Sequence, residues 1–215
     1  MRSNAMSEKF VPALAFKFLT PLYDFFSSLV GYGKRLHRRV LDIAALSGRE
    51  RILDVGSGTA SLLIEAKKRF PAVTGTGVDP DERILGIARK KFARLGVEMT
   101  LIQGSARELP FRDASFDVVI STLVFHHLSG DEKRRALDEI YRVLTKNGRF
   151  VLADFGKPQS FVSYVLLRVL SIFDGQENMR SNLAGELPIF LKKAGFQVEE
   201  NDERYRNLQF LVGLK

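Results

Sequence analysis

The sequence predicts an α/β protein with a doubly wound, mostly parallel seven-stranded sheet, an antiparallel last strand, N-terminal helices and a helical insert. Three observations lead to this prediction. Short apolar runs alternate with stretches of helical periodicity, which is the pattern of a sheet covered by helices. The first run, residues 51–55, is followed directly by Gly56 and Gly58. The fourth, residues 116–121, is almost entirely apolar, as expected of a central strand buried on both faces.

The N-terminal segment is expected to be helical and unusually aromatic. Residues 10–46 have helical character, with breaks at Pro21 and at the glycines within 31–33. So many aromatic side chains require a partner surface. Two compatible interpretations remain open: they pack on the main domain, or they form part of a lid over a substrate pocket. In the second interpretation Tyr23 is a candidate substrate contact.

The central part is expected to alternate strands and helices. Apolar residues within 81–95 follow helical spacing, and Gly96 is a typical helix terminator. Ser129 and Glu132 have the spacing of a capping box, which predicts a helix start. The pair at 147–148, Asn-Gly, predicts a turn. We therefore predict helices at 59–70, 81–95 and 131–144, and strands at 51–55, 73–78, 97–102, 116–121 and 149–155.

The C-terminal third is expected to contain an amphipathic insert at 158–174. Its apolar stripe is predicted to cover the cofactor pocket or to serve a dimer interface, and consists of Val162, Val165, Leu166, Val169 and Phe173. The opposite face is expected to hold Ser160, Tyr164, Arg168 and Ser171. After it we predict a helix at 183–194 and strands at 196–200 and 206–214.

A single domain is predicted, because no repeat, low-complexity tract or long linker divides the chain. Residues 1–5 precede Met6 and are interpreted as an expression-tag remnant. The expected parts of the domain, 6–215, are an N-terminal helical lid (6–48), a cofactor-binding core (49–155), a helical insert (156–182) and a C-terminal helix with strands (183–215).

Composition narrows the possible functions. The chain has no cysteine, which excludes disulfides, thiolate metal sites and a cysteine nucleophile, and with three histidines we expect no metal site. No apolar run reaches the roughly 20 residues of a membrane-spanning helix, so a cytoplasmic protein is expected. The net charge of +8 is spread over basic clusters in predicted helices, interpreted as solvated faces, with nucleic-acid contact as the alternative. The oligomeric state stays open.

Ligand-binding residues are expected where the parallel strands end. Gly56 and Gly58 allow close backbone approach, and Asp79, 21 positions past Gly58, suits the hydroxyls of a nucleoside ribose. A dinucleotide-binding loop would have a third glycine where this chain has Ser61. Asp54 is poorly placed beside a diphosphate but well suited to an ammonium. A cofactor with an amino-acid end is therefore favoured, and a nicotinamide dinucleotide is disfavoured.

Several motifs together resemble those of class I S-adenosylmethionine-dependent methyltransferases. They are Ile52-Leu-Asp-Val-Gly-Ser-Gly-Thr, Gly77-Val-Asp-Pro, Gln103-Gly-Ser-Ala, Phe116-Asp-Val-Val-Ile followed by His-His-Leu, and Leu144-Thr-Lys-Asn-Gly-Arg-Phe. Within this Rossmann-like class the chain is similar to the ubiquinone/menaquinone-biosynthesis-like group. The resemblance implies S-adenosyl-L-methionine as cofactor. It also implies cofactor contacts at Asp54, Gly56, Ser57, Gly58, Asp79, Pro80, Gly104, Ser105, Ala106 and Ser121.

Two positions depart from the family pattern. Ala60 stands where the first loop commonly has a third glycine, a change that a helix start tolerates. Ser105 stands where the family often has an aspartate that accepts a hydrogen bond from the adenine amine. Because a charge-assisted hydrogen bond is about twice as strong as a neutral one, we expect weaker cofactor binding in this chain.

The candidates for catalysis follow the fourth and fifth strands. His126, beside His127, and Asp154 are candidates for a general base and for substrate contact, with packing as the alternative role. Methyl transfer needs little more than positioning and desolvation, so no larger catalytic constellation is required. We expect a small, partly apolar acceptor. The alternatives are an RNA methyltransferase and a cofactor-binding protein without turnover.

Overall fold

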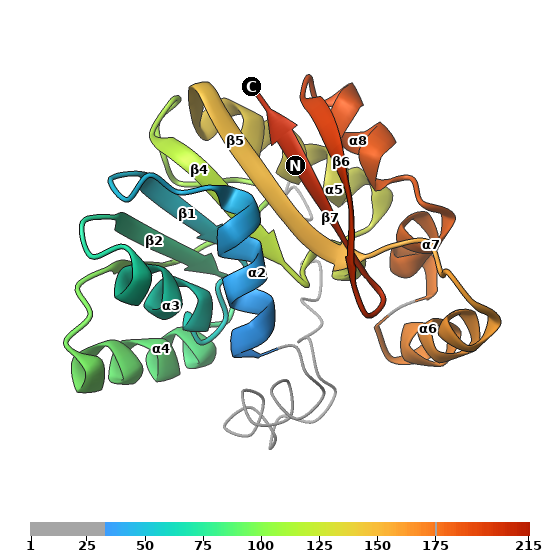
Figure 1. Ribbon diagram of the computed structural model, residues 1–215, viewed down its shortest axis with the longest axis horizontal. Coiled ribbons are helices and arrows are strands. Elements are labelled where there is room, and N and C mark those ends of the chain that lie inside the picture. Colours follow the sequence, from blue (N-terminus) through green and yellow to red (C-terminus); the bar gives the residue numbers. More distant parts are fainter. Residues whose placement is uncertain (1–32, 175) are drawn as a thin grey trace, which may run out of the picture.

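The computed structural model describes residues 33–174 and 176–215 and contains one seven-stranded sheet with the order β3-β2-β1-β4-β5-β7-β6 (Figure 1). Strands β1 to β5 are parallel, and β7 runs antiparallel to both of its neighbours. The predicted doubly wound sheet with an antiparallel last strand is confirmed. The strands are β1 (Arg51–Val55), β2 (Thr74–Asp79), β3 (Thr100–Gln103), β4 (Phe116–Thr122), β5 (Leu144–Phe155), β6 (Gln197–Tyr205) and β7 (Leu208–Leu214).

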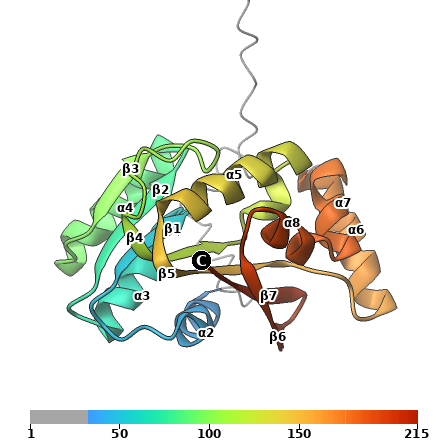
Figure 2. The ribbon, with the colours of Figure 1, turned by 90° about the horizontal axis from the view of Figure 1, so that it is seen from above.

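Helices cover both faces of this sheet. Figure 2 shows α2 and α3 on one face and α5 and α8 on the other. Neighbouring residues in β1 serve the two faces, because Ile52 belongs to the core under α2 and α3 whereas Leu53 belongs to the core under α5. The helical elements are α2 (Lys34–Ala44), α3 (Ser61–Arg69), α4 (Glu82–Leu95), the short 3-10 helix η2 (Phe125–His127), α5 (Gly130–Val143), α6 (Phe161–Asp174), α7 (Gln176–Ala184) and α8 (Leu187–Lys193).

Local sequence signals fix several helix ends as predicted. Ser129 accepts from the Glu132 amide, and the Glu132 carboxylate accepts from the Ser129 amide at 2.8 Å, which completes the capping box of α5. Asp81 caps α4 through the Arg83 amide, and Gly96 ends that helix with φ 62°. These ends matter for function because α4 begins directly after β2, at the edge where a ligand is expected.

Three predicted boundaries were wrong. Strand β5 begins at Leu144 and not at 149, because Leu144 already pairs with Phe116 and the Asn-Gly pair forms an irregularity within the strand. The predicted helix at 183–194 is confined to α8, which begins only at Leu187 because Gly185 has φ 77° and separates it from α7. The third strand is confined to β3, shorter than the predicted 97–102.

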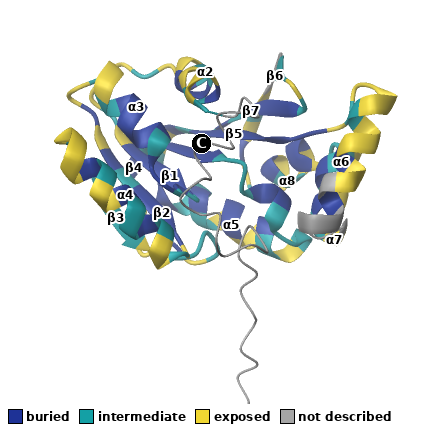
Figure 3. Ribbon diagram, turned by 90° about the horizontal axis from the view of Figure 1, so that it is seen from below, coloured by how far each residue is buried: buried dark blue, intermediate teal, exposed yellow. Residues whose placement is uncertain are grey.

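The apolar stripe predicted on the insert helix α6 is exposed where the structure describes it, and the side chain of Phe173 lies outside the described part. On α6 Leu167 and Ser171 are buried, whereas Phe161 and Val162 are 80% and 75% exposed. Figure 3 shows the exposed residues along the outer side of α6. The other described members of the predicted stripe, Val165, Leu166 and Val169, are also exposed.

Only part of the predicted N-terminal helical segment lies within the described residues. Helix α2 is formed, and its Leu36, Val40, Leu41 and Ala44 are buried in the core under α3. Tyr23 and the remainder of the predicted lid lie outside the described residues. In the ranges 33–174 and 176–215, no helix combines the length and apolar character needed to cross a membrane.

Candidate functional site

The loop after β1 folds its backbone against the end of β2. The amides of Gly56 and Ser57 donate to the Val78 carbonyl at 2.8 and 3.0 Å. Gly56 has φ 74°, and a Cβ placed on it would lie 2.2 Å from a methyl carbon of Val124. Glycine is therefore required here, because Val124 packs directly on its backbone at the point where the strand order reverses.

The loop ends in a strained residue. Ala60, at the position of the family's third glycine, has φ 56° and ψ 30° and caps the N-terminus of α3. This left-handed conformation costs a residue with a Cβ about 1–2 kcal/mol. Its amide donates to the Ser57 carbonyl at 2.8 Å, which closes the loop in spite of the strain.

Asp79 occupies the end of β2 and already holds the first loop. Its Oδ2 accepts from the Gly58 amide and its Oδ1 from the Asp81 amide, both at 2.9 Å. Burial raises the pKa of Asp79, and the two backbone hydrogen bonds oppose that rise. Each carboxylate oxygen keeps a further lone pair, which a ribose hydroxyl can use.

Asp54 is a buried carboxyl group with an unusual pKa. It is 3% exposed, and burial together with the nearby Asp79 raises its pKa to about 7. Beside it in the loop, the Ser57 hydroxyl is one of three buried side-chain polar atoms without a hydrogen-bond partner in the described part of the chain. A buried acid at raised pKa and an unpaired hydroxyl are groups that a ligand with an ammonium end would satisfy.

At the third strand tip, the Ser105 hydroxyl already has partners within the protein, which the sequence did not predict. Ser105 Oγ accepts from the Arg107 amide and from Arg107 Nε at 3.2 and 3.3 Å. Arg107 also pairs with Glu132 at 2.8 Å. With its lone pairs engaged, the Ser105 hydroxyl is left as a donor, so an acceptor role toward an adenine amine would require Arg107 to move.

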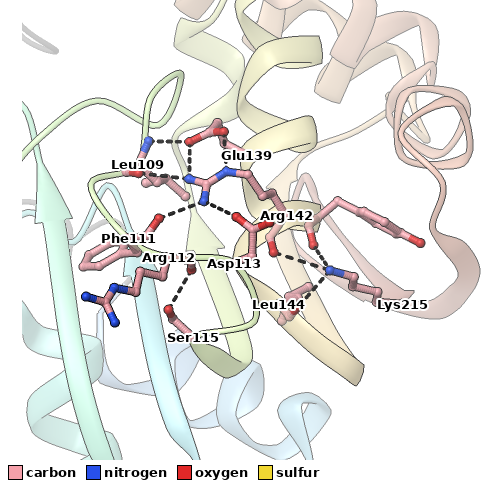
Figure 4. Close-up of polar contacts among 10 residues, drawn as sticks. Leu109, Phe111, Arg112, Asp113, Ser115, Glu139, Arg142, Leu144 and Lys215 are labelled. Carbon is pink, nitrogen blue, oxygen red and sulfur yellow. Dashed lines mark hydrogen bonds and ion pairs between the residues drawn. The ribbon is translucent and has the colours of Figure 1, made fainter.

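The chain that continues from this tip is held in place by Arg142 (Figure 4). The Arg142 guanidinium donates to the Phe111 carbonyl and the Asp113 carboxylate at 2.8 Å, and to the Leu109 carbonyl at 3.1 Å. Glu139 pairs with Arg142 at 2.8 Å and also accepts from the Leu109 amide. The loop at 109–113 is therefore a fixed wall beside the third strand tip.

Ser121 joins two strand tips. Its side chain is fully buried, and its hydroxyl donates to the Val55 carbonyl at 3.0 Å. The structure thus places Ser121 beside the first loop, as expected, with its hydroxyl proton used within the protein.

Asp154 organises the loop after β4. One carboxylate oxygen accepts from the amides of Val124 and Phe125 at 3.0 and 2.7 Å. The other lies 2.9 Å from His126 Nδ1, and also accepts from the Phe155 amide and from Asn182 Nδ2. Burial alone would raise the pKa of Asp154, but these partners, above all His126, hold it below its usual value. Asp154 is fully buried and has no remaining surface for an acceptor.

His126 is positioned by this contact. Because a carboxylate only accepts, His126 Nδ1 is the donor in this contact, and in the neutral form of the ring Nε2 then carries the lone pair. The His126 ring packs on His127, with centroids 3.9 Å apart, and edge-on to Phe155. Burial lowers the pKa of His127 to about 3, so this ring is neutral at physiological pH.

Lys133 was misassigned by sequence reasoning to a solvated basic face. It is fully buried, and its ammonium donates to the Asn178 carbonyl at 2.6 Å and the Ser181 hydroxyl at 2.8 Å. Burial lowers its pKa to about 8. The available signal was spacing, because Lys133 lies three and four residues before the buried pair 136–137. Lys133 thus attaches α7 to α5, and Asn182 attaches α7 to the end of β5.

The structure brings most of the predicted cofactor residues to one edge of the sheet. Asp54, the first loop and Asp79 meet at the tips of β1 and β2, with Pro80 accepting from Gln103 Nε2 at 3.1 Å and the Gly104 amide donating to the Asp79 carbonyl. Ala106 is partly buried beside the core under α5. Within 33–174 and 176–215, no cluster of three metal-ligating side chains is found.

This fold and this edge define a class: α/β proteins that bind a nucleoside cofactor with a cationic amino-acid end, as methyltransferases do. A family model described as a methyltransferase domain matches residues 52–148. The chain is 35% identical over 156 residues to the demethylmenaquinone methyltransferase of Thermus thermophilus, which covers 72% of this chain and 70% of that protein. It is 31% identical over 170 residues to the ubiquinone/menaquinone biosynthesis C-methyltransferase UbiE of Geobacter sulfurreducens, covering 74% and 66%.

A solved structure shares the fold. The S-adenosylmethionine-dependent methyltransferase of Aquifex aeolicus matches with a TM-score of 0.70 at 21% identity, over 96% of this chain and 98% of that one. The chain belongs to the S-adenosylmethionine-dependent methyltransferases, and its cofactor is S-adenosylmethionine. The residues at the tips of β1 and β2 fit that cofactor. Asp54 has a raised pKa, the Ser57 hydroxyl has no partner, and the loop between them contains Gly56.

Proposed function

We propose that this enzyme methylates a ring carbon of a quinol of the menaquinone type. The observation that carries the proposal is the edge formed by Asp54, the first loop and Asp79, which suits the methyl donor, together with relatives whose names specify demethylmenaquinone or C-methyl transfer. Such an acceptor is a small ring with an apolar tail, which agrees with the partly apolar acceptor that the sequence predicts.

Each part of the cofactor is assigned to a group at the strand tips. Asp54 holds the ammonium, the Gly56 to Gly58 backbone and the Ser57 hydroxyl face the methionine end, and Asp79 accepts from the ribose hydroxyls. Ser105 and Ala106, at the third strand tip, border the adenine. When bound, S-adenosylmethionine supplies a methyl group on a positively charged sulfur, which leaves with the bonding electron pair.

We propose His126 as the general base and Asp154 as the residue that positions it. His126 Nε2 accepts the proton of a quinol hydroxyl, which raises electron density on the neighbouring ring carbon. That carbon forms the new bond to the methyl carbon as the sulfur leaves with the bonding electron pair. The ring carbon then loses its own proton to water, and His126 Nε2 returns its proton to the oxygen, which restores the aromatic quinol. Asp154 keeps the Nδ1 proton in place throughout, in the manner of a carboxylate that orients a histidine.

The basic helices offer weaker support for an RNA acceptor. Several of their cations are paired with acids on the same surface, as in Arg38 with Glu65 and Arg69 with Asp42. Such pairs reduce the charge that is left to meet phosphates.

The test is methyl transfer to a demethylated naphthoquinol with a short, water-soluble side chain. We expect a C-methylated product by mass spectrometry, and a loss of kcat of about a hundredfold or more in His126→Gln with cofactor affinity retained. In the same series, S-adenosylmethionine and S-adenosylhomocysteine should raise the melting temperature and NAD should not. Full turnover by His126→Gln contradicts the base assignment, and stabilisation by NAD alone contradicts the proposed cofactor site.

A further inference from the structure

The insert helix α6 carries the largest group of exposed apolar side chains in the described structure. Of the eight large hydrophobic residues that are well exposed there, six lie on α6, and only Leu95 and Ile189 lie elsewhere. A surface helix normally turns polar residues to water. The six form what we call the α6 apolar face: Phe161, Val162, Tyr164, Val165, Leu166 and Val169.

This face is held rigidly on the protein from its opposite side. Leu167 is fully buried in the core that also contains Met179 of α7. Near the start of α6, the Ser163 hydroxyl donates to Asn207 Oδ1 at 2.7 Å, which fixes the helix to the turn between β6 and β7. The exposed side chains are therefore presented by an anchored helix.

A basic surface adjoins this helix through the same turn. Tyr205, two residues before Asn207, lies under the Arg39 guanidinium at 5.7 Å from the ring centroid. A hollow there is lined by Arg35, Arg38, Arg39, Asp42 and Tyr205. Figure 1 shows the start of α2, the β6–β7 turn and α6 along the lower edge of the molecule, where the parallel strands end.

We propose that this edge docks on an anionic lipid bilayer, with the α6 apolar face inserted at the acyl boundary and Arg35 of α2 against the headgroups. An apolar helix face combined with cationic side chains is the arrangement that binds membrane interfaces. The net charge of +8 attracts an anionic bilayer and opposes the approach of a second copy of this chain.

The inference deepens the proposed function and rests on it, because a quinol with a long apolar tail resides in the bilayer. The cofactor edge lies at the same ends of the strands as this surface. Docking would therefore place the strand tips next to the membrane and let the ring of the acceptor enter while its tail stays in lipid.

The experiment is sedimentation of the full-length chain with vesicles of equal parts phosphatidylcholine and phosphatidylglycerol, without acceptor or cofactor. We expect binding that weakens with salt and falls about tenfold or more in Phe161→Ser/Val162→Ser. Leu95→Ser, an exposed apolar residue on α4, is the matched control and should bind as the unaltered chain does. Arg35→Gln should weaken binding, and Arg94→Gln on α4 should not.

Absence of vesicle binding, or equal binding by Phe161→Ser/Val162→Ser, would overturn the proposal. So would a dimer in sedimentation equilibrium that dissociates in this double variant, because a second copy would then cover the face. Turnover of the water-soluble quinol is measured separately, without lipid. If that turnover fails while vesicle binding persists, the proposed acceptor is wrong and the docking surface stands; the reverse result rejects the docking surface alone.

Discussion

Asp54 and Asp154 are both buried acids at the next-to-last position of a parallel strand, yet their surroundings are opposite. Asp154 accepts from three backbone amides, His126 and Asn182, and its pKa is held below the usual value. Asp54 sits beside another acid, and its pKa is raised to about 7. The difference teaches that a buried acid supplied with donors by the protein supports structure, whereas one left without them is prepared for a ligand.

The contrast extends to the loops around each acid. The loop after β1 contains left-handed Ala60 and the unpaired Ser57 hydroxyl, both unfavourable to folding. The loop after β4 is tied down by Asp154, and α7 is attached to it through the Asn178 amide, which donates to the His127 carbonyl at 2.8 Å. Both loops nevertheless carry unfavourable features, because Leu123 after β4 has φ 59° and the Thr122 hydroxyl also lacks a hydrogen-bond partner, so the contrast lies in the contacts to the two acids.

The largest expected effect comes from removing the satisfied acid. Asp154→Ala leaves several buried donors without an acceptor, and we expect a loss of about 3 kcal/mol or more in the free energy of unfolding. The melting temperature should fall by roughly 6–12 °C in a scanning calorimeter. Asp117→Ala, which removes a partly exposed acid paired with Arg51, is the control and should cost less than about 1 kcal/mol. An unchanged melting temperature in Asp154→Ala would break the comparison.

The unsatisfied acid should behave in the opposite way. Because the folded-state pKa of Asp54 lies above its ordinary value of 3.8, its stabilising contribution is complete below pH 3.8 and is lost as pH rises through about 7. Asp54→Asn should therefore raise the melting temperature of the cofactor-free protein at about pH 8 and weaken S-adenosylmethionine binding about tenfold or more. Thermal shift with and without cofactor measures both. Destabilisation together with unchanged affinity would contradict the assignment.

The strain in the first loop should give a smaller effect. Ala60→Gly removes the cost of a Cβ at φ 56° but adds unfolded-state entropy, so a net gain of about 0.5–1 kcal/mol is expected from chemical denaturation. Ala93→Gly, in the exposed interior of α4, should lose about 1 kcal/mol. Losses of equal size in both variants would show that position 60 carries no strain.

The smallest expected effect is at the third strand tip. Ser105→Asp should raise cofactor affinity only a few-fold, because Arg107 competes with the adenine amine for the new carboxylate. Adding Arg107→Gln should enlarge the gain, as measured by calorimetric titration. If neither variant binds more tightly, Ser105 does not limit affinity.

Much of the fold was predictable because alternating patterns and glycine positions act locally. The positions of Gly56, Gly58 and Asp79 at the ends of strands were predictable from the alternation of strands and helices alone. The last strand, β7, was expected to be antiparallel, and it is antiparallel to both of its neighbours.

Other features depend on contacts between distant residues. The five donors around Asp154 come from three separate segments, and no spacing rule joins Asn182 to it. Lys133 is buried because α7 supplies its acceptors. The pattern of α6 showed which residues are apolar but not which face packs on the protein, and here Leu167, outside the predicted stripe, makes that contact.

The most direct test of the contrast between the two acids is the proton released when S-adenosylmethionine binds. At about pH 6.5, Asp54 in the free protein is mostly protonated, and pairing with an ammonium should expel most of one proton, about 0.7. Calorimetric titration in buffers of different ionisation enthalpy measures this number. We predict that release for the unaltered chain and none for Asp54→Asn. Equal release by both proteins, or none by either, would contradict the account of Asp54 as the acid kept for the ligand.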